Sequence, residues 1–150
     1  IMEVQSVYST SIKQNRCRVE CIIVAEDIAV ENFVVDTGAM YTCCNYLLVN
    51  DKLDETSLKD CETNCIGGLI EGDKVRFYKY ALKQFTIGNI DLGEQSIWIT
   101  FDQRVTDIIL GMDILRQIMM IINPYNQQVH FCRNYIDYRT NFEPLLCEYN

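Results

Sequence analysis

The sequence contains the stretch Asn32-Phe33-Val34-Val35-Asp36-Thr37-Gly38-Ala39, an apolar run that stops abruptly at an acid, a hydroxyl and a glycine. The run Phe33 to Val35 is typical of a short strand that is buried on both faces, because turn-forming residues bound it. Asp36 then lies at the end of that strand, and the chain turns at Gly38. A carboxylate in such a place is costly unless something uses it, so Asp36 is the first candidate for a functional residue.

Two further landmarks follow in the chain. They are the glycine-rich segment Ile66-Gly67-Gly68-Leu69-Ile70-Glu71-Gly72 and the apolar segment Ile108-Ile109-Leu110-Gly111-Met112-Asp113-Ile114-Leu115. With Asp-Thr-Gly-Ala, these segments resemble the active-site motif, the flap and the hydrophobic-hydrophobic-glycine segment of retropepsin-like (retroviral-type) aspartic proteases. An isolated Asp-Thr-Gly recurs by chance, whereas three landmarks in this order are a specific pattern. The resemblance covers residues 16 to 132.

The resemblance implies a role for each matched residue. Asp36 would be the general acid and base, Thr37 would hydrogen-bond across a two-fold axis, and Gly38 would leave room for water and substrate. Ala39 completes this active-site loop. The flap would cover the substrate with Ile66, Gly67, Gly68, Leu69 and Ile70, and the active-site loop would be supported by Leu110 and Gly111.

The number of candidate acids predicts the assembly. A chain of 150 residues is about one domain, and it holds no second Asp-Thr-Gly or Asp-Ser-Gly. Two carboxylates pressed together cannot both ionise, so one accepts a proton from water while the other donates one. We therefore expect a homodimeric aspartic endopeptidase in which Asp36 meets Asp36 of a second chain. Asp107 and Asp113 are the alternatives if the second acid comes from the same chain, although Asp113 is better explained as an acid in the first turn of a helix.

The predicted fold is all-β, a small closed acid-protease barrel with one helix in the C-terminal half and one lobe per chain. We expect a single domain over residues 1–150, with a core over 16–132 and a C-terminal extension over 133–150 that puts the usual dimer interface of the family in doubt. Strands are expected over 16–25, 28–35, 74–87, 92–101, 107–110 and 128–132, and a helix over 112–119. The glycines of the flap are expected at the tip of a hairpin. Residues 47–60 form an insertion of unknown role, and residues 1–13 are either an edge strand or a loose arm.

Charge and hydropathy exclude several partners. Lys plus Arg total 13 against 21 Asp plus Glu, a net charge of −8, so we expect no nucleic-acid ligand. The longest apolar region, residues 108–122, is interrupted by polar residues and falls short of the roughly 20 residues that a membrane-spanning helix needs. No signal peptide is visible after Ile1-Met2, so we expect a cytoplasmic protein. The expected partners are a second copy and a protein or peptide substrate, with no cofactor.

Eight cysteines require an explanation. Cys17 and Cys21 share one face of a predicted strand but lie about 13 Å apart at a rise of about 3.3 Å per residue, which is beyond disulfide reach. Only Cys61 and Cys65 have a spacing compatible with pairing, and the chain has a single histidine, His130, and no Cys-x-x-Cys pair. Reduced, mostly packed thiols are therefore favoured, with a disulfide or a structural zinc as alternatives, and we expect no metal site.

Three functions from different classes remain. The favoured one is the endopeptidase, and the second is a catalytically silent retropepsin-like module for dimerisation or peptide binding. The third is a zinc-binding or redox protein, which the cysteine spacing disfavours. Alone, Asp36 is better explained as a capping or turn acid, and Gly67-Gly68 is equally well explained as an ordinary hairpin turn. The order of the three landmarks reverses this preference and favours the functional explanation.

Overall fold

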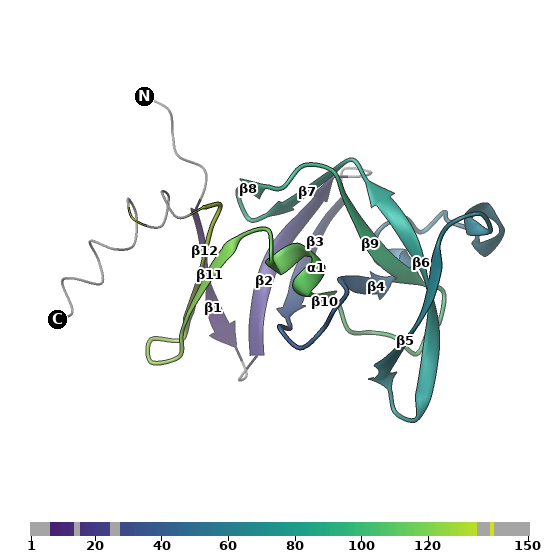
Figure 1. Ribbon diagram of the computed structural model, residues 1–150, viewed down its shortest axis with the longest axis horizontal. Coiled ribbons are helices and arrows are strands. Elements are labelled where there is room, and N and C mark those ends of the chain that lie inside the picture. The colour runs from purple at the N-terminus through teal and green to yellow at the C-terminus, as the bar shows by residue number, and fades with distance from the viewer. Residues whose placement is uncertain (1–6, 14–15, 25–27, 135–138, 140–150) are drawn as a thin grey trace.

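A computed structural model describes residues 7–13, 16–24, 28–134 and 139 of the chain (Figure 1). In these residues the chain forms a 12-stranded sheet with one short α-helix, in the C-terminal half. The strands follow the order β11-β12-β1-β2-β3-β10-β4-β9-β6-β5, and β7 and β8 branch from β2. The predicted all-β fold with one helix is confirmed.

The predicted first hairpin is present, and it delivers Asp36 to the middle of the sheet. Strands β2 (Arg16–Val24) and β3 (Ile28–Val35) pair antiparallel. On its other side β3 pairs in parallel with β10 (Ile109–Leu110), which in turn lies against β4 (Cys43–Asn45). Because β3 has neighbours on both sides, its end is held firmly, and the residue that follows it has a fixed position.

The flap is also a hairpin, but its tip differs from the prediction. Strands β5 (Thr63–Ile70) and β6 (Asp73–Leu82) pair antiparallel. The expected tip, Gly67-Gly68, lies within β5, and the turn falls at Glu71-Gly72 instead. Two glycines in this hairpin have positive φ, and only one of them makes the turn. Gly72 (φ 72°) lies in the turn, whereas Gly68 (φ 92°) lies at a β-bulge where the register of the two strands shifts.

Two apolar clusters lie on opposite faces of the central strands. In β9 (Gln95–Thr100), Ile97 and Ile99 belong to the larger cluster and Trp98 to the smaller one, as their alternation predicts. The larger cluster holds Phe33, Phe85, Leu110 and Phe131 among others. The smaller cluster comprises Cys43, Val75, Phe77, Trp98, Val105 and Ile109 and packs against Ile66, Leu69 and Ile70 of the flap.

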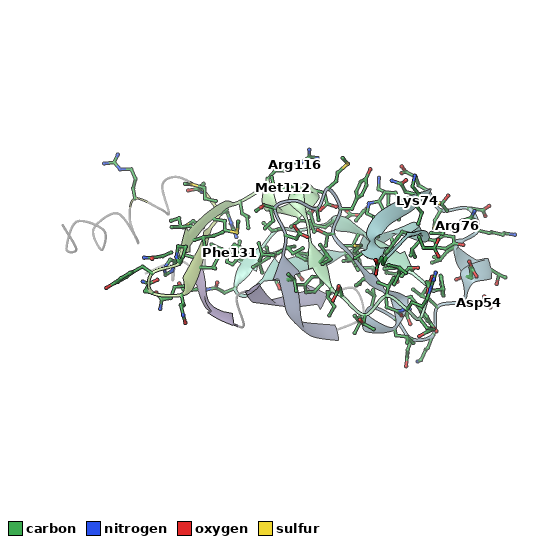
Figure 2. The ribbon with its side chains drawn as sticks, turned by 90° about the horizontal axis from the view of Figure 1, so that it is seen from below. Asp54, Lys74, Arg76, Met112, Arg116 and Phe131 are labelled. Atoms are coloured by element: carbon green, nitrogen blue, oxygen red, sulfur yellow. The ribbon has the colours of Figure 1, made fainter. Side chains whose placement is uncertain are left out.

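The helix expected over 112–119 is shorter than predicted. Helix α1 spans Met112–Leu115, and the chain then enters a strand that the sequence analysis missed, β11 (Met119–Asn123). β11 pairs along its length with β12 (Gln128–Cys132), for example Met120 with Phe131. The apolar pattern of these residues fits a helix as well as a strand, and the backbone pairing with β12 favours the strand. Figure 2 shows Phe131 of β12 far from Lys74 and Arg76 of β6.

The remaining segments complete the sheet. β1 (Val7–Lys13) pairs with β12 and β2, so this part of residues 1–13 is a strand. The single strand expected over 74–87 is divided in two: after β6 the chain bends and continues as β7 (Gln84–Ile87), which pairs with β2 and, across the turn at Gly88-Asn89, with β8 (Ile90–Asp91). The insertion contains two 3-10 helices, η1 (Tyr46–Leu48) and η2 (Glu55–Leu58).

No helix among the described residues has the length and apolar character needed to span a bilayer. Most of the extension 133–150 and the side chains of Cys17 and Cys21 lie outside the described residues.

Candidate active site

Asp36 follows β3 and is held by the backbone of its own loop. Its amide donates to the carbonyl of Leu110 (3.0 Å), and its carbonyl accepts from the amide of Ala39 (3.1 Å). The amide of Gly38 donates to Oδ1 of Asp36 (2.9 Å). A Cβ at position 38 would lie only 3.2 Å from that oxygen, so glycine suits this close approach. The loop therefore fixes the carboxylate, while Thr37 and Gly38 are exposed.

The expected supporting residues lie directly behind this loop. Leu110 is fully buried in the larger cluster. A Cβ on Gly111 would lie 2.5 Å from the carbonyl carbon and oxygen of Tyr41, so no other residue fits without a backbone shift. The amide of Met112 donates to the carbonyl of Ala39 (2.8 Å), which joins the start of α1 to the active-site loop.

A polar contact that the sequence analysis missed reinforces this junction. The buried hydroxyl of Thr42 donates to Oδ1 of Asp113 (2.6 Å) and accepts from the amide of Gly111 (3.0 Å). The Asp113 carboxylate also accepts from the amides of Thr42 and Ile114. Asp113 is thus an acid in the first turn of α1, as predicted. Its long-range partner had no local signal, because the two residues meet only in the folded chain.

The active-site loop and the flap face each other across a cavity of about 750 Å³. Of the predicted site residues, those that line it are Asp36, Gly38, Ala39, Ile66, Gly67, Gly68 and Leu69. Thr37 and Ile70 do not line the cavity, and Leu110 and Gly111 lie behind it. Residues that the sequence analysis did not assign to the site complete the wall: Val34, Val35, Met40, Tyr41, Cys43, Cys65, Asp107 and Ile109.

The electrostatics of the cavity are acidic. Among the described residues that line it, the charged ones are Asp36 and Asp107, with neither lysine nor arginine. Burial, and to a smaller extent the nearby carboxylates of Asp113, Asp107 and Asp36, together raise the pKa of the Cys43 thiol to about 12. Cys43 is therefore a neutral thiol in the wall.

Three further cysteines and the histidine were also candidates for a disulfide or a metal site. Cys44, Cys61 and Cys65, like Cys43, carry free thiols. Within the part of the chain that the structure describes, no group of three or more His, Cys, Asp or Glu side chains is placed to hold a metal ion. Nδ1 of His130 lies 2.7 Å from the Ser9 hydroxyl, so this histidine has a hydrogen-bond partner within the fold.

Comparison with known proteins agrees with this geometry. The fold resembles that in the crystal structure of a retropepsin-like aspartic protease from Rickettsia conorii, with a TM-score of 0.60 and 15% identity over 83% of this chain and 89% of that chain. A family model described as aspartyl protease matches residues 21–114, well over half of the chain. The chain therefore belongs to the aspartyl protease family, and its fold is retropepsin-like. The comparison with curated proteins gave no match.

Proposed function

We propose that this chain is a homodimeric aspartic endopeptidase in which the Asp36 carboxylates of two copies share one proton. The ionised carboxylate takes a proton from water as its oxygen attacks the carbonyl carbon of a peptide bond. The protonated carboxylate gives its proton to the carbonyl oxygen, which forms a tetrahedral diol. As the diol collapses, the first carboxylate passes the proton it took from water to the leaving nitrogen, and the second carboxylate regains a proton from a diol hydroxyl. The observation that carries this proposal is the position of Asp36 in a cavity between its own loop and the flap.

The surface beside Asp36 suits a second copy of the chain. Thr37 is exposed next to the catalytic acid, where its hydroxyl can meet the same loop of a partner. Met40 and Met112 are 68% and 39% exposed, and they flank that loop. Figure 2 shows Met112 and Arg116 at one edge of the molecule. Apolar side chains around a polar loop are typical of a surface that is covered on association.

The flap suits an extended peptide substrate. A peptide that lies in the cavity meets β5 along Cys65 to Leu69, where Gly67 and Gly68 expose backbone rather than side chain. Backbone hydrogen bonds to a strand give affinity, and the pockets beside it give specificity. We further propose that residues 1–150 act as one catalytic domain, with the core at 16–132 and the extension 133–150 outside the chemistry.

A peptide-library digest tests the proposal. The wild-type protein is incubated with the library beside Asp36→Asn, which preserves size but removes the proton acceptor. Asp51→Asn, a change of the same charge at an exposed position outside the cavity, is the control. We expect cleavage by the wild type and the control, and none by Asp36→Asn. Cleavage by Asp36→Asn at a rate near that of the wild type would exclude this mechanism, and no cleavage by the wild type would favour a catalytically silent peptide-binding module.

A further inference from the structure

Asp107 is a second acid in the cavity that the proposed chemistry does not use. It precedes β10, which β3 fixes: the amide of Val34 donates to the carbonyl of Ile108 (2.7 Å). Asp107 and Ile109 both line the cavity, as expected for residues two apart in an extended chain. Ile108, between them, packs against the larger core cluster instead. The backbone therefore holds the exposed carboxylate of Asp107 toward the cavity.

This carboxylate has no counter-charge in the described part of the chain. No ion pair involves Asp107 there, and no hydrogen bond to it is found. The cation closest to it in the sequence, Arg104, is already engaged by Asp102 (2.7 Å) and Asp73 (3.0 Å). Arg104, Asp102 and Asp73 are all absent from the residues that line the cavity.

The rest of the wall suits the stem of a long side chain. Val34, Ile109 and Leu69 present apolar surface to the same cavity. Lysine and arginine bury their methylene stems along apolar surface while the charged head reaches a polar partner. An apolar wall that also carries the unpaired carboxylate of Asp107 is therefore complementary to a basic side chain and unfavourable for an acidic one.

We propose that Asp107 is a specificity-determining residue, which selects peptides that carry lysine or arginine close to the scissile bond. This inference rests on the proposed function, because it assigns the substrate class of the same cavity. The effect of the neighbouring carboxylates on the Cys43 thiol supports it, since it shows that their charge is felt inside the wall. In the homodimer each chain contributes its own Asp107, so both sides of the cleaved bond share the preference.

The test compares peptides that differ at one position, with lysine, norleucine or glutamate. Norleucine keeps the stem of lysine and lacks its charge. For the wild type and for the control Asp51→Asn, we expect kcat/KM to be about tenfold higher for lysine than for norleucine, the size of a charge-assisted hydrogen bond. Asp107→Asn removes this ratio while it still cleaves the norleucine peptide. Asp107→Lys reverses the order, so that the glutamate peptide becomes the better substrate.

Other outcomes overturn the proposal. One is an unchanged lysine-to-norleucine ratio in Asp107→Asn. Another is the loss of all cleavage in a folded Asp107→Asn protein, which would make Asp107 a partner of Asp36 in the chemistry. If the wild type cleaves no peptide, the proposed function fails but the specificity is still measurable by calorimetry on Asp36→Asn. That protein should bind the lysine peptide more tightly than the norleucine peptide, and Asp36→Asn/Asp107→Asn should not; equal binding would overturn the inference.

Discussion

Thr42 and Asp113 lie 71 positions apart in the chain and are joined by hydrogen bonds from both the amide and the hydroxyl of Thr42. The same hydroxyl accepts a hydrogen bond from the amide of Gly111. These contacts connect the segment that follows Asp36 to the start of α1. The position of the candidate catalytic loop therefore depends on a buried polar contact outside the Asp-Thr-Gly motif.

Replacing Thr42 by valine should destabilise the fold. Valine has nearly the same shape, so the change leaves the amide of Gly111 and the carboxylate of Asp113 without the hydroxyl. We expect the free energy of unfolding to fall by about 2 kcal/mol, the cost of leaving buried polar groups without a partner. Urea unfolding measures it, and Thr106→Val at an exposed position is the control. Equal stabilities of the two variants would show that the hydroxyl does not hold the loop.

Gly111→Ala should destabilise the fold more than the addition of a single methyl group usually does. The backbone at Gly111 is extended (φ −98°), a conformation that alanine adopts readily, so the cost comes from the contact with Tyr41. We expect a loss of about 3 kcal/mol, as for overpacking of a filled core. Gly67→Ala is the matched control, because its Cβ would meet only Cγ of Lys74 at 3.8 Å. Thermal unfolding compares the two, and similar losses in both variants would contradict the steric argument.

The sequence was sufficient to predict the fold because its strongest signals are local. The run that ends at Asp36, the glycines of the flap and the segment that ends at Gly111 each depend on neighbours in the chain. The tip of the flap was misplaced because Gly68 and Gly72 both adopt positive φ, and the sequence does not say which one turns the chain. The predicted helix over 112–119 was too long because the apolar residues after Leu115 fit a helix as well as a strand.

The parts of the site that could not be predicted are long-range. Asp107 lines the cavity only because β10 pairs with β3. From the sequence, Asp107 was no more than an alternative for the second catalytic acid. Thr42 is one of many hydroxyls in the sequence, and only the fold brings it to Asp113. Local patterns thus located the motif, while the contacts that support it and the charge beside it required the structure.

The reactivity of the cysteines should follow their burial. At pH 8, Cys65 on the exposed flap strand should be alkylated faster than Cys43 and Cys44, which are buried. Burial raises the pKa of both buried thiols, that of Cys43 to about 12, so the reactive thiolate is scarce at pH 8 and increases only as the pH rises. Iodoacetamide labelling followed by peptide mass spectrometry measures this order. Cys65→Ser should remove the label from the flap peptide, and labelling of Cys43 as rapid as that of Cys65 in the folded protein would contradict the burial of Cys43.

Activity should depend on the concentration of the chain. Each copy supplies one Asp36 to the proposed pair, so specific activity should fall on dilution as dimers dissociate. Each chain carries a net charge of −8, so two copies repel one another, and added salt should restore activity at a given dilution by screening that repulsion. An excess of added Asp36→Asn chains should lower activity, because they form heterodimers that contain only one Asp36. An excess of Asp51→Asn chains should not lower it. Sedimentation measured on the same samples gives the fraction of dimer. If specific activity stayed constant where only monomer sediments, catalysis would need a second acid from the same chain, and Asp107, in the same cavity as Asp36, would be the first to replace.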